Sequence, residues 1–237
     1  MIKNILKKKE AKIAKGRKIA ILGTSPSSVD EAPYDDKSWE IWNLGRNFLN
    51  QKRFDLWFEL HYIWLLHELK MIPDQFEHMK KCGNKLIIQA PHADYPEAQI
   101  YPKDDILAKY PRRYFTSSIA WMLALAIEQK PTHIGIWGID LCVNEEYNYQ
   151  RPCVEYLLGV AEGRGIDVTI PKVSTICRAS YLYGFEEPNW LSDIALRRKE
   201  TESAMAENEK KARDHAEAVA YLKGVNDCLK DQEKRWM

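Results

Sequence analysis

Short apolar runs that alternate with helical patterns constrain the fold of this chain more than any other feature of its sequence. Residues 18–23 (KIAILG) form such a run, bounded by glycine and typical of a strand buried on both faces of a sheet. Five more runs follow, at 39–45, 54–60, 85–89, 133–140 and 167–171. Because helical patterns separate them, we expect an α/β fold, a Rossmann-like open and mostly parallel sheet with helices on both faces.

Helical patterns occupy the segments between these runs. Residues 118–129 (SIAWMLALAIEQ) are apolar on nearly every side, as in a helix enclosed within a fold. Ser117 or Ser118 is placed to cap the first turn of this helix. Residues 63–81 and 153–164 show the spacing of amphipathic helices, so the sequence predicts one enclosed helix and two that face solvent on one side.

The composition changes after residue 190, which indicates a separate C-terminal segment. Residues 191–237 hold ten basic and ten acidic side chains, one glycine and no proline, and they predict a charged helical extension. Its apolar stripe of Ala218, Leu222, Val225 and Leu229 packs either on the body or against a second copy of the chain. A homo-oligomer through this helix is therefore one of two expectations.

The net charge of +1 is unevenly distributed. Residues 1–18 carry eight Lys or Arg and one Glu, whereas residues 19–190 carry 17 Lys or Arg and 23 Asp or Glu. Binding a polyanion needs clustered cations, so the body is a poor general nucleic-acid binder. The basic arm, residues 1–17, either contacts nucleic acid or an acidic partner or is a solubilising helix start. We expect three parts: this arm, a Rossmann-like domain (18–190) and the extension (191–237).

Cysteine spacing and hydropathy exclude several classes of protein. The five cysteines lie at least eleven positions apart, which excludes CxxC metal or redox motifs and argues against a disulfide framework. No segment reaches the roughly 20 apolar residues of a membrane helix, and the N-terminus lacks the apolar core of a signal peptide. The sequence predicts a cytoplasmic protein with no membrane span, and it contains no DxD metal motif.

The turn after the first run, residues 23–28 (GTSPSS), predicts an anion-binding site. In an open parallel sheet the first such turn presents backbone N–H groups to a ligand, and Gly23 allows a close approach. Pro26 suits the first position of a following helix, whose N-terminus attracts anions. The turn also offers the hydroxyls of Thr24, Ser25 and Ser27. It matches neither GxGxxG nor the Walker motif, and an ordinary strand-to-helix turn is the alternative.

Trp42 and Asn43 follow near the end of the second run (WEIWNLG), beside the expected anion site. An indole face stacks on a nucleobase, and an amide pairs with a base edge or a ribose hydroxyl. These two residues are therefore predicted to contact the base or ribose of a nucleotide. Packing of Trp42 in the core is the alternative.

Residues 53–61 (RFDLWFELH) place carboxylates within an apolar strand. Alternation puts Asp55, Trp57 and Glu59 on one side, while His61 stands at the carboxyl tip. A carboxylate in such a strand is unfavourable unless it is paired or used. Glu59 and His61 are therefore candidates for a general base or a ligand anchor. A structural ion pair to Arg53 is the alternative.

Residues 114–118 (YFTSS) bring more hydroxyls to a helix N-terminus. Thr116, Ser117 and Ser118 predict a second site for an anion or for sugar hydroxyls, or they merely cap the helix.

Asp140 ends the fifth run, where an acidic side chain meets ligand hydroxyls or a substrate proton. The residues after it predict a polar loop that could close over a ligand, with Glu146, Tyr147 and Arg151 as candidates. All five motifs fall at carboxyl ends of expected strands, so we expect them to meet at one edge of the sheet.

The order of these motifs resembles the bacterial CMP-sialic-acid-dependent sialyltransferases. GTSPSS after the first strand, Asn43 after the second, and YFTSSIAWMLALAI leading into HIGIWGIDL carry the resemblance over residues 18–175. The chain also looks like small phage proteins that share its GTSP, RFD-WFELH and EYNYQ stretches. The resemblance to sialyltransferases implies a Rossmann-like glycosyltransferase in which the GTSPSS turn and Asn43 hold a nucleotide.

Two departures from the family bear on the chemistry. The second glycine of the family's turn is Ser25 here, and no histidine lies between His133 and His215, where the family's longer lid carries its base. The base would then be His61, Glu59, Asp140 or Glu146.

Three functions follow from these observations. The first is a metal-independent glycosyltransferase with a CMP- or UDP-type nucleotide-sugar donor and an unknown acceptor, which in a phage protein could be a DNA base. The second is another nucleotide-processing enzyme, such as a hydrolase or phosphotransferase. The third is a non-catalytic nucleotide-binding or assembly protein.

Overall fold

The computed structural model describes residues 16–45, 47, 52–68, 73–141, 145–179, 181–186 and 190–236. The chain divides into two compact units, residues 1–178 and 179–237. The sequence-based boundary lay at 190, and most of the predicted basic arm (1–17) lies outside the described residues.

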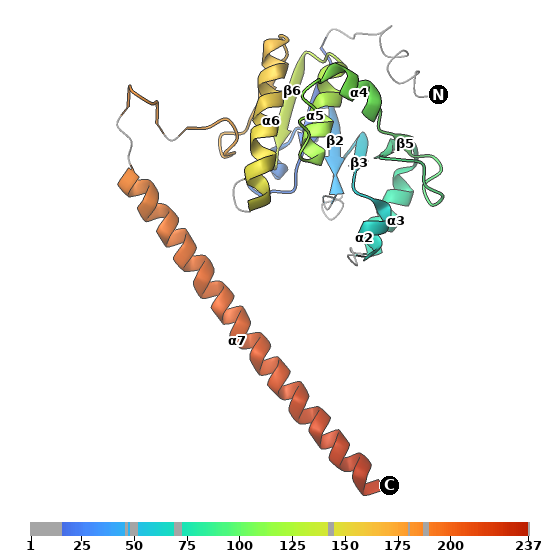
Figure 1. Cartoon of the computed structure of the whole chain (residues 1–237), viewed down its shortest axis with the longest axis vertical. Helices are drawn as coiled ribbons and strands as arrows, with labels where there is room; N and C mark the ends of the chain where they lie inside the picture. The colour runs from blue at the N-terminus through green and yellow to red at the C-terminus, as the bar shows by residue number, and fades with distance from the viewer. Residues whose placement is uncertain are drawn as a thin grey trace. The chain divides into compact units, whose positions relative to one another are not determined.

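A parallel sheet forms the centre of the first unit (Figure 1). Its seven described strands are ordered β5-β4-β3-β2-β1-β6-β7, and every neighbouring pair is parallel. The strands are β1 (Lys18–Leu22), β2 (Trp39–Leu44), β3 (Leu56–Glu59), β4 (Leu86–Ile88), β5 (Gln99–Ile100), β6 (His133–Trp137) and β7 (Asp167–Thr169). The chain proceeds outward from β1 to β5 and then returns to β6 on the other side of β1. The carboxyl ends of β1 and β6 therefore border the crevice where such sheets bind ligands.

Helices connect the strands and cover both faces of the sheet, which confirms the predicted Rossmann-like α/β class. They are α2 (Ile63–Glu68), α3 (Pro73–Cys82), α4 (Lys103–Lys109), α5 (Ser118–Glu128) and α6 (Glu145–Gly163), with 3-10 turns η1 (Val29–Glu31) and η3 (Gly83–Lys85).

Alternation along the strands distributes side chains between the two faces. Ile19 and Ile21 of β1 belong to the main core, which the apolar residues of α5 and α6 complete. Ala20 and Leu22 face the opposite side and pack with Trp39 of β2 in a smaller cluster. A third cluster lies where α3 packs on β3 and β4. Since both faces of β1 are fully buried, its continuous apolar sequence is explained.

Glu128 at the end of α5 joins three helices. Its carboxylate lies 2.8 Å from Lys109 Nζ of α4 and 2.6 Å from Arg164 Nη1, just after α6. Burial by itself would raise the pKa of Glu128, but hydrogen bonds from these two cations outweigh burial and hold that pKa below its ordinary value of 4.5. The ion pairs therefore stabilise the fold while Glu128 is charged.

Three local predictions were wrong. Residues 63–81 form α2 and α3 rather than one helix, and Pro73, which has no N–H to donate, begins the second. The helix expected to start at Pro26 is replaced by the short turn η1. The ten residues after Asp140 were predicted as a polar loop, but residues 145–150 belong to α6, which also accommodates Pro152 within its length. In addition, the two-residue strand β5 carried no sequence signal.

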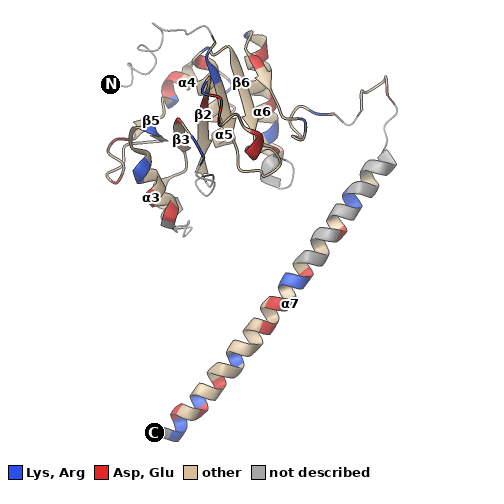
Figure 2. Ribbon diagram, turned by 180° about the vertical axis from the view of Figure 1, so that it is seen from behind, with Lys and Arg blue, Asp and Glu red and all other residues tan. Residues whose placement is uncertain are grey.

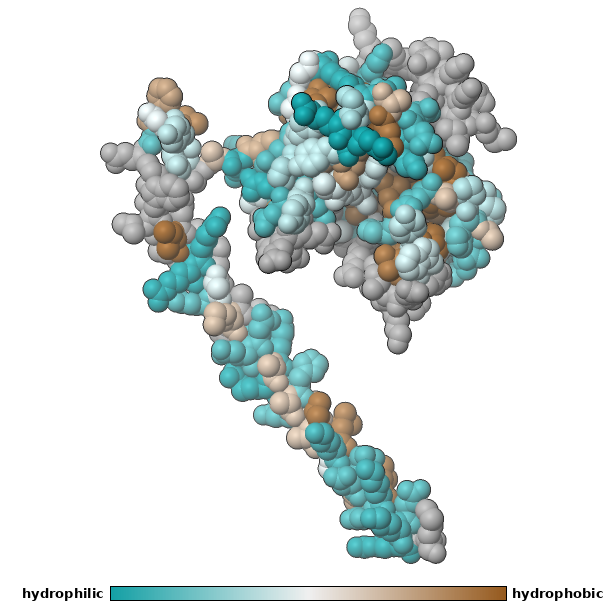
Figure 3. Space-filling model, in the orientation of Figure 1, coloured by the Kyte–Doolittle hydropathy of each residue, from teal (hydrophilic) through white to brown (hydrophobic). Residues whose placement is uncertain are grey.

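Among its described residues, the second unit contains one helix, α7 (Trp190–Trp236), of 47 residues. Side chains of both signs alternate along it (Figure 2), and apolar side chains are scattered among polar ones (Figure 3). The predicted stripe residues Leu222, Val225 and Leu229 are exposed. No helix within the described ranges is both long enough and apolar enough to cross a membrane.

Candidate functional site

A hollow of about 790 Å³ lies at the carboxyl ends of β1, β2, β3 and β6. We call it the first hollow. Its lining comes from the segment after β1, the tip of β3, the N-terminal turn of α5 and the loop after β6. It brings together eight of the residues predicted from sequence, namely Gly23, Thr24, Ser25, His61, Thr116, Ser117, Ser118 and Asp140.

Two glycines allow the segments after β1 and β6 to cross in close contact. A Cβ atom on Gly23 would lie 2.2 Å from the carbonyl oxygen of Gly138, and Gly138 itself has a φ of +65°. Gly23 N–H donates to Trp137 O at 2.8 Å, and Ser25 N–H donates to Gly138 O at 2.9 Å. These two amides therefore cannot bind an anion.

The predicted anion cradle is thus wrong in its main element. The amides of Gly23 and Ser25 are used within the protein, and the following turn η1 is too short to present a helix N-terminus. Pro26 and Ser27 do not line the hollow, and Ser27 Oγ lies 3.1 Å from Ser25 Oγ, within hydrogen-bond distance. The segment instead contributes the Thr24 and Ser25 side chains to the hollow.

Asp140 presents an unsatisfied oxygen at the switch point of the sheet. Ser25 Oγ donates to Asp140 Oδ2 at 2.5 Å. Its other oxygen, Oδ1, is buried and has no hydrogen-bond partner among the described residues. A buried acceptor left unpaired costs about 1–3 kcal/mol, so this oxygen is suited to accept a hydrogen bond from a bound molecule.

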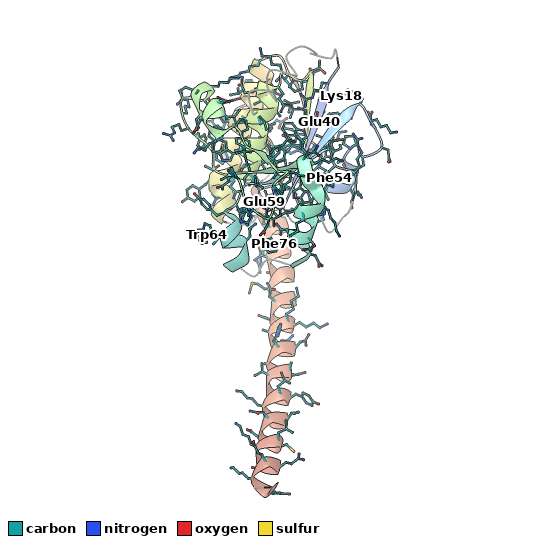
Figure 4. The ribbon with its side chains drawn as sticks, turned by 90° about the vertical axis from the view of Figure 1, so that its right-hand side faces the viewer. Lys18, Glu40, Phe54, Glu59, Trp64 and Phe76 are labelled. Carbon is teal, nitrogen blue, oxygen red and sulfur yellow. The ribbon has the colours of Figure 1, made fainter. Side chains whose placement is uncertain are left out.

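His61 is oriented by a buried carboxylate. Glu59 is 1% exposed, and its Oε1 lies 2.6 Å from His61 Nδ1 and accepts the His61 backbone N–H at 3.1 Å. Gln75 of α3 donates to Glu59 Oε2 at 2.8 Å. A proton held on Nδ1 by Glu59 makes Nε2 the basic ring nitrogen. Figure 4 shows Glu59 within the domain; it does not line the hollow, so it positions His61 rather than meeting a ligand.

The N-terminus of α5 forms another wall of the first hollow. Ser117 caps the helix by accepting the Ala120 N–H at 3.3 Å, as predicted. Thr116 Oγ1 donates to Tyr149 O at 3.0 Å, which ties this turn to α6. The N-terminal end of a helix of this length carries a partial positive charge and attracts anions. The structure thus confirms the capping role that was the alternative for this turn, while anion binding by residues 116–118 stays a prediction.

Trp42 and Asn43 do not reach the hollow, and their predicted role in stacking or pairing with a base is wrong. Trp42 is fully buried, packs on Phe58 and donates from Nε1 to Glu40 Oε1 at 2.9 Å. Asn43 is 4% exposed, and its Oδ1 accepts the amide of Asn47 at 2.6 Å. Asn47 also donates to Gly23 O, so these asparagines connect β2 to the end of β1.

The remaining predictions fall on α6. Arg151 donates to Glu155 Oε1 at 2.9 Å and to Thr175 O at 2.5 Å, and it does not line the hollow, so its predicted ligand role is not met. The side chains of Glu146 and Tyr147 lie outside the described residues. The apolar walls of the hollow and one amide were not predicted; they are Leu44, Leu60, Phe115, Ile119, Trp121, Ile139, Leu141 and Gln150. The sequence signal that could have identified these residues is their position at the end of an expected strand or on one face of an expected helix.

Within the described ranges, no group of three or more His, Cys, Asp or Glu side chains is placed to hold a metal ion. The polar groups that line the first hollow are a helix N-terminus, hydroxyls, one carboxylate, one imidazole and one amide. Such a set can bind a negatively charged group, accept hydrogen bonds from hydroxyls and remove a proton.

Comparisons with known proteins return similarity in structure. No protein-family model matches the sequence, and no curated protein matches it. The monofunctional alpha-2,3-sialyltransferase Cst-I from Campylobacter jejuni is 12% identical, with a TM-score of 0.45 over 81% of this chain and 96% of that chain. The sialyltransferase CstII from Campylobacter jejuni, in complex with cytidine-5'-monophosphate, is 15% identical, with a TM-score of 0.44 over 73% of this chain and 95% of that chain. Both are bacterial sialyltransferases, the family that the sequence motifs resemble.

Proposed function

We propose that the protein is a glycosyltransferase that binds a CMP- or UDP-type nucleotide-sugar in the first hollow. The supporting observation is that one hollow of about 790 Å³ is lined both by the N-terminus of α5 and by His61, which Glu59 orients. This volume lies within the range of roughly 300–1,000 Å³ typical of small-molecule sites. The two features supply the two needs of glycosyl transfer, an anion site for the leaving nucleotide and a base for the acceptor.

The donor phosphate lies against residues 116–118 at the start of α5. Backbone amides there, with the hydroxyl of Ser118, stabilise the charge that grows on the phosphate as the sugar leaves. Asp140 Oδ1, the unpaired oxygen across the hollow, accepts a hydroxyl or amino group of the nucleotide or the sugar. No metal ion is required by this arrangement, since the helix N-terminus opposes the phosphate charge.

His61 acts as the general base. Its Nε2 takes the proton of the acceptor hydroxyl while the oxygen forms a bond to the anomeric carbon of the sugar. The bond from that carbon to the phosphate oxygen breaks, and the nucleotide leaves with the bonding electron pair. Glu59 stabilises the imidazolium that forms, because its carboxylate already accepts the Nδ1 proton. Positioning within the hollow supplies much of the remaining rate.

Nucleotide binding and release test this function. Wild-type protein is screened by thermal shift against nucleotides, where a ligand at 100 times its dissociation constant adds about 2.7 kcal/mol. Release of CMP or UDP from nucleotide-sugars is then measured with and without a saccharide mixture, in the presence and absence of EDTA. His61→Gln is expected to lower release by about 10²-fold or more without weakening nucleotide binding.

His215→Gln on α7 is the matched control and is expected to leave release unchanged, because His215 is exposed in the second unit. Failure of every CMP and UDP compound to stabilise the protein would contradict the proposal. So would release that His61→Gln does not affect.

A nucleotide-sugar hydrolase is the second candidate. The His61 side chain is 59% exposed, so water can reach it as readily as a sugar hydroxyl can. Release that proceeds at the same rate without any acceptor would favour this candidate over transfer.

A further inference from the structure

A second hollow of about 680 Å³ adjoins the first at the carboxyl ends of β3, β4 and β5. Leu60 and Trp121 line both hollows and form the wall between them. His61 lines the first hollow and Tyr62 lines the second, so consecutive residues after β3 serve opposite sides of this wall. The proposed base therefore stands at the boundary of the two hollows.

The shared wall is held in place by stacking and hydrogen bonding. The Trp121 ring stacks on Phe115 with a centroid distance of 3.9 Å and an interplanar angle of 9°. The buried Tyr101 hydroxyl donates to the Trp121 carbonyl at 2.7 Å. Burial raises the pKa of Tyr101 well above its ordinary value, so the hydroxyl stays a proton donor. The wall that separates the two hollows is thus held by packed aromatic side chains.

The second hollow offers an aromatic face and carboxylates. Tyr62 is 58% exposed and stacks on Trp64, which projects outward from α2 (Figure 4), with a centroid distance of 5.8 Å and an angle of 29°. Asp104 and Asp105 outnumber Lys103 among the charged residues of the described lining. Carboxylates accept hydrogen bonds from hydroxyl and amino groups, and aromatic faces pack against C–H groups and cations. The same carboxylates repel phosphates.

We propose that the second hollow binds the acceptor and that the acceptor is an uncharged or cationic saccharide. The Tyr62 ring packs on a face of the sugar ring, Asp105 accepts its hydroxyls, and the attacking hydroxyl passes Leu60 and Trp121 to reach His61. The role of the second hollow as acceptor site rests on the proposed function, whereas the capacity of the second hollow to bind a saccharide does not. A nucleic-acid acceptor is disfavoured by the negative charge of the lining.

Saccharide binding is measured directly by saturation-transfer NMR, with and without CMP. The probes are methyl glucoside, methyl galactoside, methyl mannoside, N-acetylglucosamine and glucosamine, with a thymidine decanucleotide as the anionic comparison. Tyr62→Ala and Asp105→Asn are each expected to weaken binding of at least one saccharide by about fivefold or more, the effect of one aromatic contact or one hydrogen bond. The matched controls Tyr183→Ala and Asp231→Asn change exposed residues of the second unit and are expected to leave binding unchanged.

The outcomes separate this inference from the proposed function. If no saccharide binds under either condition, or if both hollow variants bind as the wild type does, the inference is overturned even where nucleotides bind the first hollow. If the decanucleotide binds and the same variants abolish its binding, the acceptor is a nucleic acid and the inference is again overturned. If saccharides bind as expected but no nucleotide does, the second hollow is supported as a saccharide site and the proposed transfer reaction fails.

Discussion

Replacing Gly23 with alanine tests the crossing of the segments that follow β1 and β6. The added Cβ would lie 2.2 Å from Gly138 O, far inside the roughly 3.5 Å at which such atoms attract each other. Because the clashing atom belongs to the backbone of Gly138, a side-chain movement cannot relieve the clash and the two segments must separate. Overpacking of this kind costs about 1–3 kcal/mol. Separation also weakens the hydrogen bond from Gly23 N–H to Trp137 O, which adds about 1 kcal/mol.

We therefore expect Gly23→Ala to lower the free energy of unfolding by about 2–4 kcal/mol and the Tm by roughly 10 °C. Urea titration followed by tryptophan fluorescence measures the change, because Trp42, Trp57 and Trp137 are buried in the first unit. Far-UV circular dichroism is less suitable, since the 47-residue helix α7 contributes much of that signal.

Gly159→Ala is the matched control, because the same substitution is expected to change stability in the opposite direction there. Gly159 lies within α6, and a Cβ on it would meet no atom within 4 Å. Alanine in a helix interior is expected to raise stability by about 0.5–1 kcal/mol. If Gly23→Ala unfolds at the same urea concentration as the wild type or a higher one, the close crossing that shapes the first hollow is refuted.

Three further predictions concern single side chains. Glu59→Gln is expected to lower kcat for nucleotide release and to leave KM within about twofold of the wild-type value. The substitution removes the charge that stabilises protonated His61 but removes no contact with the ligand, so an equal change in KM would contradict a positioning role. Ion pairs lower the pKa of Glu128, so its contribution to stability is present above about pH 4.5 and is lost as the pH falls. Urea titrations at about pH 3.5 and pH 7 measure this effect: Glu128→Gln is expected to reduce the difference in the free energy of unfolding between the two pH values. Burial raises the pKa of Cys82 to about 12, so mass spectrometry after maleimide treatment of the folded protein is expected to find label on exposed Cys228 and none on Cys82.

The edge of the sheet that carries the first hollow was predictable from sequence. Ser25 and His61 follow, and Asp140 ends, an apolar run that the pattern assigns to a parallel strand. Carboxyl ends of parallel strands share one edge, so these residues meet although they are distant in the chain. The N-cap at Ser117 was predictable for a similar reason, since a hydroxyl directly before an apolar helical pattern has a local structural role.

The distinction between Trp42 and His61 was not predictable, because it depends on where each strand ends. Trp42 lies two positions before the end of β2 and belongs to the core, whereas His61 lies two positions past the end of β3 and lines the hollow. A strand rises by about 3.3 Å per residue, so an uncertainty of two residues moves a side chain from core to ligand site. The fate of the Ser25 amide depended on Gly138, a residue of another segment, which a local pattern cannot reveal.

Gln75 links the packing on one face of the sheet to the chemistry at its edge. Met79 lies one helical turn after Gln75 in α3 and packs in a cluster with Trp57 of β3. Trp57 and Glu59 share a face of β3 because strand side chains alternate, so α3 covers both of them. The hydrogen bond from Gln75 to Glu59 is therefore held by the same apolar packing that stabilises this face. His61 inherits its orientation through Glu59, and the position of the proposed base depends on core residues that never touch the hollow.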